Sequence, residues 1–491
     1  MRCSRLRISS GVLAAVLAMV IGLAGWPAQA QSRNGSPPAP PPFSPSDLTN
    51  IPGLTPYQAA NASTIDVLCP KLVDAGLLGQ PTATGDLTTL CTQLKVTTTQ
   101  NQNPQGNAPP LNLGLTEGQL GDVLGQWTHD QATENSRASI EIGARQARTI
   151  AGRLAALRLG ARGLSVSGLG TGETKTLAWS EVMDAQGGGA SADTDLLNRF
   201  GVFVNATYAW GDKDPTSREI GFDYDIAGVI LGADYRITEN LIAGAAFNYA
   251  HTSADFQSGL GKTDTNSFGG LLYAMYYLAS FFVDGYVGYN GNLYDTERRI
   301  VYGTGPGATV PAGTSVNRTA AASPSGQQLS FGLGGGYDFA LGAATITPLI
   351  RTEFIGLHVD GYTESGADGL NLKVAQQKAT SFVTALGAQF SYAFSLPFGI
   401  LVPTVRAEWR HEYLNDSRGI RAQYAADPCF GGVCQVFAIP TDSPDRDYAS
   451  LNFGIASAFK GGWQGFFNYE LIVGLRDINY NQLTAGVRFE F

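Results

Sequence analysis

The four histidines are the first candidates for acid–base or metal chemistry, and they are widely separated, at positions 129, 251, 358 and 411. Only His411 has close acidic neighbours, Glu408 and Glu412, which would suit general acid–base catalysis if the three side chains met. In a β-strand, successive side chains point to opposite faces, so His411 and Glu412 would diverge. We therefore interpret Glu412 as an ion-paired residue and His411 as an interfacial one.

Motifs for other chemistry are missing from the sequence. It has no Gly-x-Ser-x-Gly nucleophile elbow, no His-Glu-x-x-His zinc motif and no phosphate-binding loop. We therefore predict no catalytic, cofactor-binding or metal-binding residue, and a protein that is not an enzyme. The formal net charge of −9 also argues against a nucleic acid partner.

The N-terminus has the features of a signal peptide over residues 1–30. Three arginines precede an apolar run at 11–25, and Ala28-Gln29-Ala30 forms a small-residue cleavage site. The apolar run is too short for a spanning helix, and no other stretch reaches 18 apolar residues. Any insertion of the exported chain into a membrane must therefore use strands.

Four of the five cysteines lie outside the signal peptide. An even number in an exported chain favours disulfides, and proximity in the sequence favours the pairs Cys69–Cys91 and Cys429–Cys434. A metal site is the weaker alternative, because no histidine lies within a few positions of any of these cysteines.

The region before residue 195 divides by composition. We expect a Pro-rich disordered lead at 31–60. At 61–112 we expect a small helical, disulfide-stapled region that ends in a linker at 96–112. A long amphipathic helix is predicted at 113–160, followed by a Gly/Ser-rich connector at 161–195. Five arginines surround the apolar stripe of this helix. The helix either docks outside the domain formed by residues 195–491 or lies inside it.

The pattern changes to strands from Phe200 onward. Apolar and polar or small residues alternate with period two, and each segment exceeds the roughly 9–11 residues that a tilted membrane strand needs. Twelve such segments are predicted, at 200–211, 222–236, 240–252, 264–278, 280–295, 325–339, 342–359, 376–395, 398–414, 446–460, 463–474 and 479–491.

The connections between these segments alternate in length. Short ones such as 237–240 and 279–280 alternate with longer ones, including 296–324, 360–375 and 415–445. Outer-membrane barrels have short periplasmic turns and long outer loops. We therefore predict an all-β membrane fold over 195–491, a twelve-stranded antiparallel outer-membrane β-barrel, with the C-terminus in the periplasm.

Charged residues on the strands indicate which faces point inward. An ionised basic group would cost roughly 2–4 kcal/mol on a lipid-facing surface, so charged strand positions are expected to face the lumen. The predicted lumen-facing charged residues are Arg351, Glu353, Arg406, Glu408, Arg410, Glu412, Glu470, Arg488 and Glu490.

Several stretches resemble the translocator domain of autotransporters, the type V self-secreting proteins. They include NRFGVFVNATYAWGDKD, the hairpin YDIAGVILGADYRITENLIAGAAFNY, TVRAEWRHEYLNDSR and the terminal phenylalanine. The resemblance implies a helix through the barrel lumen and a passenger that reaches the cell surface. It also implies that the alternating Val487, Phe489 and Phe491 are read by the barrel-assembly machinery.

Three functions remain open from the sequence. The chain is expected to be a translocator and anchor that presents its short N-terminal region or its own loops at the cell surface. The alternatives are a surface adhesion or interaction barrel and a passive outer-membrane channel. The expected partners are outer-membrane lipid and, during biogenesis, the barrel-assembly machinery and periplasmic chaperones.

The last strand should be indispensable for assembly. Deleting residues 482–491 should prevent insertion, because the sheet could no longer close and its unpaired edge would face lipid. A folded barrel migrates faster on a gel when it is not heated, so this shift should be lost. A normal shift in the truncated chain would contradict the prediction.

Overall fold

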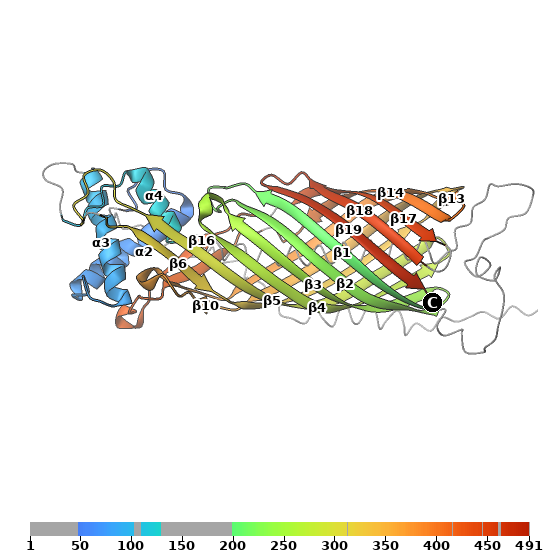
Figure 1. Cartoon of the computed structure of the whole chain (residues 1–491), viewed down its shortest axis with the longest axis horizontal. Helices are drawn as coiled ribbons and strands as arrows, with labels where there is room; N and C mark the ends of the chain where they lie inside the picture. The colour runs from blue at the N-terminus through green and yellow to red at the C-terminus, as the bar shows by residue number, and fades with distance from the viewer. Residues whose placement is uncertain are drawn as a thin grey trace, which may run out of the picture. The chain divides into compact units, whose positions relative to one another are not determined.

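The computed structural model describes residues 48–102, 110–128, 199–311, 313–414, 416–443, 445–459 and 463–490. Within these ranges the chain forms a β-barrel, together with three helices and a small sheet that pack at one of its ends (Figure 1). Among the described helices, none is both long enough and apolar enough to cross a bilayer. The predicted signal peptide, most of the predicted long helix and the connector lie outside the described residues.

The barrel is a closed ring of twelve antiparallel strands, as the sequence predicts. Each strand pairs with its neighbours in the ring, and β19 returns to pair with β1 from Gly201↔Glu490 to Lys213↔Ile478. In ring order the strands are β1 (Phe200–Lys213), β2 (Phe222–Thr238), β3 (Leu241–Phe256), β4 (Gly261–Leu278), β5 (Phe281–Tyr302), β7 (Ser325–Tyr337), β9 (Ala344–Val359), β12 (Gln377–Tyr392), β14 (Gly399–Glu412), β17 (Asp447–Phe459), β18 (Trp463–Val473) and β19 (Ile478–Glu490).

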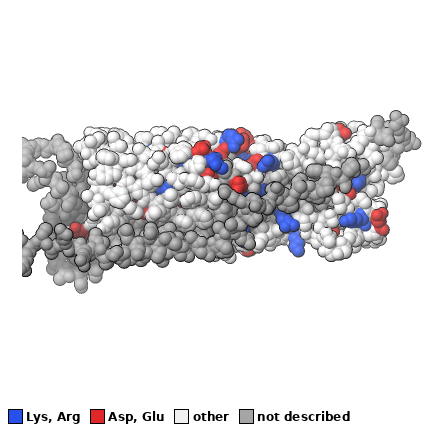
Figure 2. Space-filling view, turned by 180° about the vertical axis from the view of Figure 1, so that it is seen from behind, with Lys and Arg blue, Asp and Glu red and all other residues white. Residues whose placement is uncertain are grey.

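The two faces of the barrel wall follow the period-two pattern. In β1, Phe203 and Asn205 are buried, whereas Val202 and Val204 between them are exposed. On the face drawn in Figure 2, much of the surface is uncharged, and charged side chains gather in a central group and more sparsely to its right. Apolar side chains on the outer wall can face lipid. The hydrogen bonds of the closed ring also leave the spanning backbone no open edge.

The barrel has two ends that differ in their connections. We call the end with the tight turns at 239–240, 279–280, 342–343 and 397–398 the turn end; β1 begins and β19 ends there. The short pairs β8 (Phe339–Leu341) with β9 and β13 (Phe394–Leu396) with β14 tighten two of these turns. The other end, which carries 303–324, 360–376 and 413–446, is the loop end.

The loop end is more ordered than the sequence suggests. Strand β5 extends to Tyr302 and pairs there with β6 (Val316–Ala322). A second antiparallel sheet has the order β10 (Tyr362–Thr363), β11 (Leu372–Val374), β15 (Gly419–Tyr424) and β16 (Val436–Pro440). We call this sheet, with β6, the loop-end part of β5 and the connections between these strands, the loop platform. Apart from β5, its strands have two to seven residues, too few to give a clear alternation in the sequence.

Three helices form what we call the helical segment, residues 48–102 and 110–128. They are α2 (Pro56–Asp74), α3 (Ala83–Gln102) and α4 (Glu117–Gln126). Capping boxes start α2 at Thr55 and α4 at Thr116, where the side chain of a glutamine three residues later accepts from the backbone of the capping threonine. The Cys69–Cys91 disulfide joins α2 to α3, as predicted.

The helical segment and the loop platform share one hydrophobic core, to which each side contributes many fully buried residues. The buried residues of the helical segment include Leu48, Ile51, Ile65, Leu68, Leu72, Leu87, Leu94, Leu120, Leu124 and Trp127. Those of the platform include Ile300, Val316, Ala320, Leu370, Leu372, Val374, Ile420, Tyr424, Phe437 and Ile439.

Three predicted boundaries in the N-terminal region are wrong. The predicted lead at 31–60 overlaps the folded region, because Leu48 and Ile51 are buried and α2 begins at Pro56. The expected linker at 96–112 is partly helical, since α3 continues to Gln102. A single helix over 113–160 is also excluded, because α4 ends at Gln126 and the backbone turns at Trp127. The first two segments are ordered by tertiary contacts that composition does not show: Leu48 and Ile51 join a shared core, and Thr97 and Asn101 bond to Leu113 and Leu115.

Removing a core side chain of the helical segment should destabilise it without affecting the barrel. Leu94 is fully buried, so Leu94→Ala should cost the helical segment about 2–5 kcal/mol of unfolding free energy. The measurement is protease resistance of residues 48–128 across a urea series, with the gel shift of the barrel as a second readout. Leu78→Ala is the control, because Leu78 is 42% exposed. Equal resistance of the two variants would contradict the shared core.

Candidate functional site

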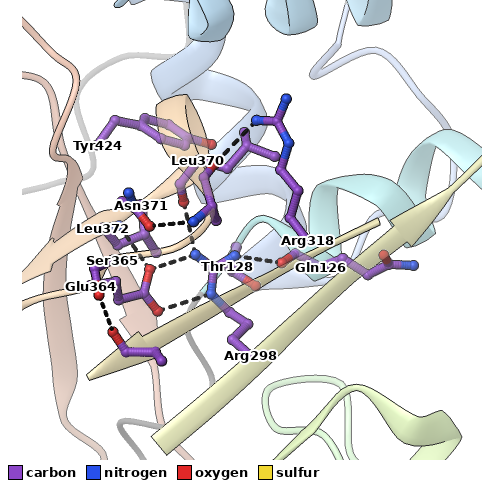
Figure 3. A network of polar contacts seen from close by, with 12 residues as sticks. Gln126, Thr128, Arg298, Arg318, Glu364, Ser365, Leu370, Asn371, Leu372 and Tyr424 are labelled. Atoms are coloured by element: carbon purple, nitrogen blue, oxygen red, sulfur yellow. Dashed lines mark hydrogen bonds and ion pairs between the residues drawn. The ribbon is translucent and has the colours of Figure 1, made fainter. Parts of the chain in front are cut away.

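The contact between the helical segment and the loop platform centres on Arg298 of β5, whose polar contacts are drawn in Figure 3. Its guanidinium is 2% exposed and forms two bonds with Glu364, Nη2 to Oε2 at 2.6 Å and Nε to Oε1 at 3.1 Å. Nη2 also donates to the Leu370 carbonyl at 2.8 Å, and Nη1 donates to the Gln126 carbonyl at 2.7 Å. One buried cation therefore ties the barrel, two platform segments and α4 together.

Glu364 is buried as deeply as Arg298, and its charge is compensated on both oxygens. Besides the two arginine bonds, Oε2 accepts from the Leu372 backbone amide at 2.8 Å. A buried ion pair is expensive to desolvate, and losing one partner leaves an uncompensated charge that costs about 3–5 kcal/mol. The pair therefore fixes one geometry of the platform.

A second arginine binds α3. Arg318 of β6 forms a bidentate salt bridge with Asp86, with Nη1–Oδ2 at 2.5 Å and Nη2–Oδ1 at 2.8 Å. Asp86 lies in the first turn of α3, where a negative charge is favoured by the helix dipole. Its Oδ2 also accepts from the Gly369 amide at 3.0 Å, so this carboxylate contacts two platform segments.

Asn61 of α2 joins three elements through its buried amide. Its Nδ2 donates to the Leu124 carbonyl at 2.9 Å, and its Oδ1 accepts from the Tyr424 hydroxyl at 2.6 Å. Burial raises the pKa of Tyr424, so its hydroxyl stays protonated and acts as the donor. Trp127 packs edge-on against Tyr424, with ring centroids 6.3 Å apart. The polar and aromatic contacts meet where α2 and α4 touch β15.

Backbone contacts complete the interface beside α4. The Leu113 carbonyl accepts from Gly305 N at 2.8 Å, and the Asn112 carbonyl accepts from Thr309 N at 2.8 Å. Gly114 has φ +68° and approaches so closely that a Cβ atom there would lie 2.7 Å from the Gly305 carbonyl oxygen. Only glycine combines this left-handed conformation with so close an approach.

The charged residues predicted to face the lumen lie mainly on the buried face of the barrel wall. Seven of the nine are buried, Arg406 is partly exposed, and the side chain of Glu490 lies outside the described residues. Several are paired: Arg410 with Glu408 at 3.0 Å and Glu353 at 3.5 Å, Arg406 with Glu408 at 3.5 Å, Arg351 with Asp284 at 3.5 Å, and Arg488 with Asp234 at 2.9 Å. Hydroxyl donors bind the other two carboxylates, Ser381 that of Glu412 and Ser450 that of Glu470.

His411 does not join those carboxylates. Its Nδ1 lies 2.8 Å from Asp447 Oδ1, which also accepts from Trp409 Nε1, on the opposite face of the strand from Glu408 and Glu412. The second disulfide, Cys429–Cys434, closes a tight excursion before β16. No group of three or more metal-ligating side chains is assembled in the described ranges.

Two of the three residues of the predicted assembly signal, Val487 and Phe489, lie in the closing strand β19. Val487 is exposed on the outer wall, and the Phe489 ring packs against Trp463 at the turn end, with centroids 4.9 Å apart. Phe491 lies outside the described residues. Phe489 thus places one aromatic side chain near the end of the strand that closes the ring.

Sequence reasoning missed Arg298, Glu364, Arg318 and Asp86. The alternation of β5 could have indicated that one of the consecutive Arg298 and Arg299 faces inward. Nothing in the sequence near Glu364 or Asp86 indicates a partner, because the paired residues are separated by 66 and 232 positions. Asp234 and Asp284, partners of inner-face arginines, were likewise not named as site residues.

A closed barrel with an apolar outer wall and paired charges inside defines the class of outer-membrane β-barrels. The sequence model of the autotransporter β-domain family matches residues 202–470. That match covers more than half of the chain, and the chain belongs to this family. It is an outer-membrane barrel of the translocator type.

Curated relatives match the same part of the chain. Outer membrane protein A of Rickettsia conorii is 23% identical over 293 residues, which are 58% of this chain and 14% of that protein. Outer membrane protein B of the same species is 24% identical over 287 residues, 57% of this chain and 16% of that protein. The chain thus spans less than a fifth of the length of these relatives.

Solved structures with a similar fold include autotransporter domains. The translocator domain of NalP from Neisseria meningitidis is 14% identical, covers 60% of this chain and 89% of its own, and has a TM-score of 0.46. The β domain of Bordetella BrkA is 17% identical, covers 60% of this chain and 100% of its own, and has a TM-score of 0.41.

Removing the Tyr424 hydroxyl should lower the unfolding free energy of the helical segment. Tyr424→Phe would leave Asn61 Oδ1 buried without its donor, which should cost about 1–3 kcal/mol of unfolding free energy. The thermal midpoint for proteolysis of residues 48–128 should fall, while the gel shift of the barrel is retained. Tyr413→Phe, at a half-exposed ring, should have no effect. A fall of the same size in both variants would contradict the assignment.

Proposed function

We propose that this barrel carries the helical segment across the outer membrane and presents it at the cell surface, together with the loop platform. The observation that supports the proposal is the position of the helical segment. It packs on the loop end of the barrel, whereas β1 begins and β19 ends at the turn end. A region that precedes the barrel in the chain is thus folded at the far end of the barrel.

Membrane topology turns this position into a function. Short turns of outer-membrane barrels face the periplasm and long loops face outward. With that orientation, Arg199 enters the barrel from the periplasmic side, and Thr128 lies on the outer side with the platform. Because the chain is exported through the periplasm, residues 48–128 must cross the membrane to reach that position. The translocator of the family is the element that performs such a crossing.

A surface interaction module is the second function that a specific observation favours. The helical segment and platform share a core, and each contains one disulfide, so they form a rigid unit at the end of the barrel. Such a unit suits contact with other molecules at the surface. It is compatible with translocation, because the unit exists only after crossing.

Labelling of single introduced cysteines on intact cells tests the orientation. Thr304→Cys and Ser443→Cys, at exposed loop-end positions, should react with a membrane-impermeant maleimide. Asp74→Cys, exposed at the end of α2, should react equally if the helical segment is presented outside. Thr238→Cys and Ser395→Cys, exposed at the turn end, should react only after the cells are opened.

Two outcomes would contradict the proposal in different ways. Labelling of the two turn-end cysteines on intact cells would mean that the barrel is inserted in the opposite orientation. Labelling of Thr304→Cys without labelling of Asp74→Cys would mean that the barrel is correctly inserted but the helical segment is not presented.

A further inference from the structure

We propose that the loop platform is a docking receptor for the chain's own helical segment, which holds residues 48–128 on the barrel without a covalent link. The inference deepens the proposed function, on which its biological setting rests, by naming the partner of the platform. It means that cutting the chain between Thr128 and Arg199 does not release the exported segment. The anchor of this docking is Arg298.

The shared core is the first argument for docking. Trp127, at the end of α4, is fully buried, with Tyr302 and Tyr424 of the platform at ring-centroid distances of 6.5 and 6.3 Å. Leu120 and Leu124 of α4 belong to the same cluster as Ile300 and Leu370. Without the platform these apolar side chains would meet water, and without the helices so would the platform. Neither part closes its core alone, as in an interface of the obligate kind.

The second argument is that the Arg298 guanidinium binds acceptors on both sides of the contact. Arg298 takes two of its acceptor groups from Glu364 and Leu370 in the platform and the third from the Gln126 carbonyl. That carbonyl belongs to the last turn of α4, where carbonyls lack helical partners and a cation is favoured by the dipole. The Gln126 side chain, in turn, accepts from the Val301 amide at 2.7 Å. Undocking would leave polar groups on both sides unpaired.

The third argument is that the docked position is fixed in register. Asp86 at the start of α3 meets Arg318, Asn61 of α2 meets Tyr424, and Leu113 meets Gly305 through the backbone. The Thr84 hydroxyl adds a bond to the Ala426 carbonyl at 3.0 Å. These contacts lie at separate points of the helical segment and reach β5, β6, β15 and the loops between them. A contact spread in this way resists dissociation, because no single opening motion breaks all of it.

The test is to cut the folded protein and ask whether the two parts stay together. A site for a sequence-specific protease is inserted after Gly188 in the full chain, and the protein is folded in detergent. After cutting, size-exclusion chromatography should show the fragment that carries residues 48–128 eluting with the barrel. Elution of the fragment away from the barrel in the unsubstituted protein would overturn the proposal.

Neighbouring arginines supply a matched pair of variants. Arg298→Gln should raise the dissociation rate of the cut fragment on the order of 30-fold or more, because a buried charged partner is lost. Arg299→Gln should leave the rate unchanged, because Arg299 is exposed on the other face of the same strand. Equal rates for these two variants would overturn Arg298 as the anchor. The gel shift of the barrel reports whether each variant has folded.

A second pair of variants keeps the test decisive if the Arg298→Gln protein does not fold. Arg318→Gln removes the ion pair with Asp86 at a less buried position, and Arg421→Gln is its exposed control on β15. Faster loss of the fragment from the first variant alone supports docking, and equal loss overturns it. Because the measurement is made in detergent, its result does not depend on which side of a membrane the platform faces. Failure of docking is therefore distinguishable from failure of surface presentation.

Discussion

The structure depends on the closure of the sheet by β1 and β19. In a bilayer no water is available for backbone amides and carbonyls, so an open edge would leave a row of them unsatisfied at several kcal/mol each. The pairing that runs from Gly201↔Glu490 to Lys213↔Ile478 removes that edge. Once the ring is closed, the period of two assigns every side chain either to lipid or to the interior. The paired charges of the inner wall, such as Arg410 with Glu408, are a consequence of that assignment.

Closure also creates two ends with different physical possibilities. At the turn end the strands return within a few residues, and little chain is left to build on. At the loop end the chain has room for β6 and for a separate four-stranded sheet. Without the helical segment, the platform would expose apolar residues to water. The helical segment packs on them and buries them in one shared core. The barrel is thus a support on which a second folded unit is assembled.

The buried pair Arg298–Glu364 gives that unit a defined geometry. Apolar contacts alone tolerate several arrangements, because the hydrophobic effect is not directional. A desolvated guanidinium is tolerated only where its acceptors are in place, and here they come from the platform and from the end of α4. Burial of this charge therefore favours a single docked arrangement over a loose association.

The sequence by itself determined the barrel, its twelve strands and the two cysteine pairs, because these depend on local periodicity, turn spacing and proximity along the chain. Most strand boundaries agree to within a few residues; β9, for instance, was expected at 342–359 and begins at Ala344. The exception is β5, which was expected to end at residue 295 and continues to Tyr302. Only the tertiary structure decided how the loops fold and that the helical segment packs on them. Arg318 and Asp86 are 232 residues apart. The end of α3 is helical where composition suggests a linker because it bonds to a later segment, with Thr97 accepting from Leu113 N and Asn101 donating to the Leu115 carbonyl. Contacts between short, distant segments leave no period in the sequence, and for that reason the docking site was visible only in the folded chain.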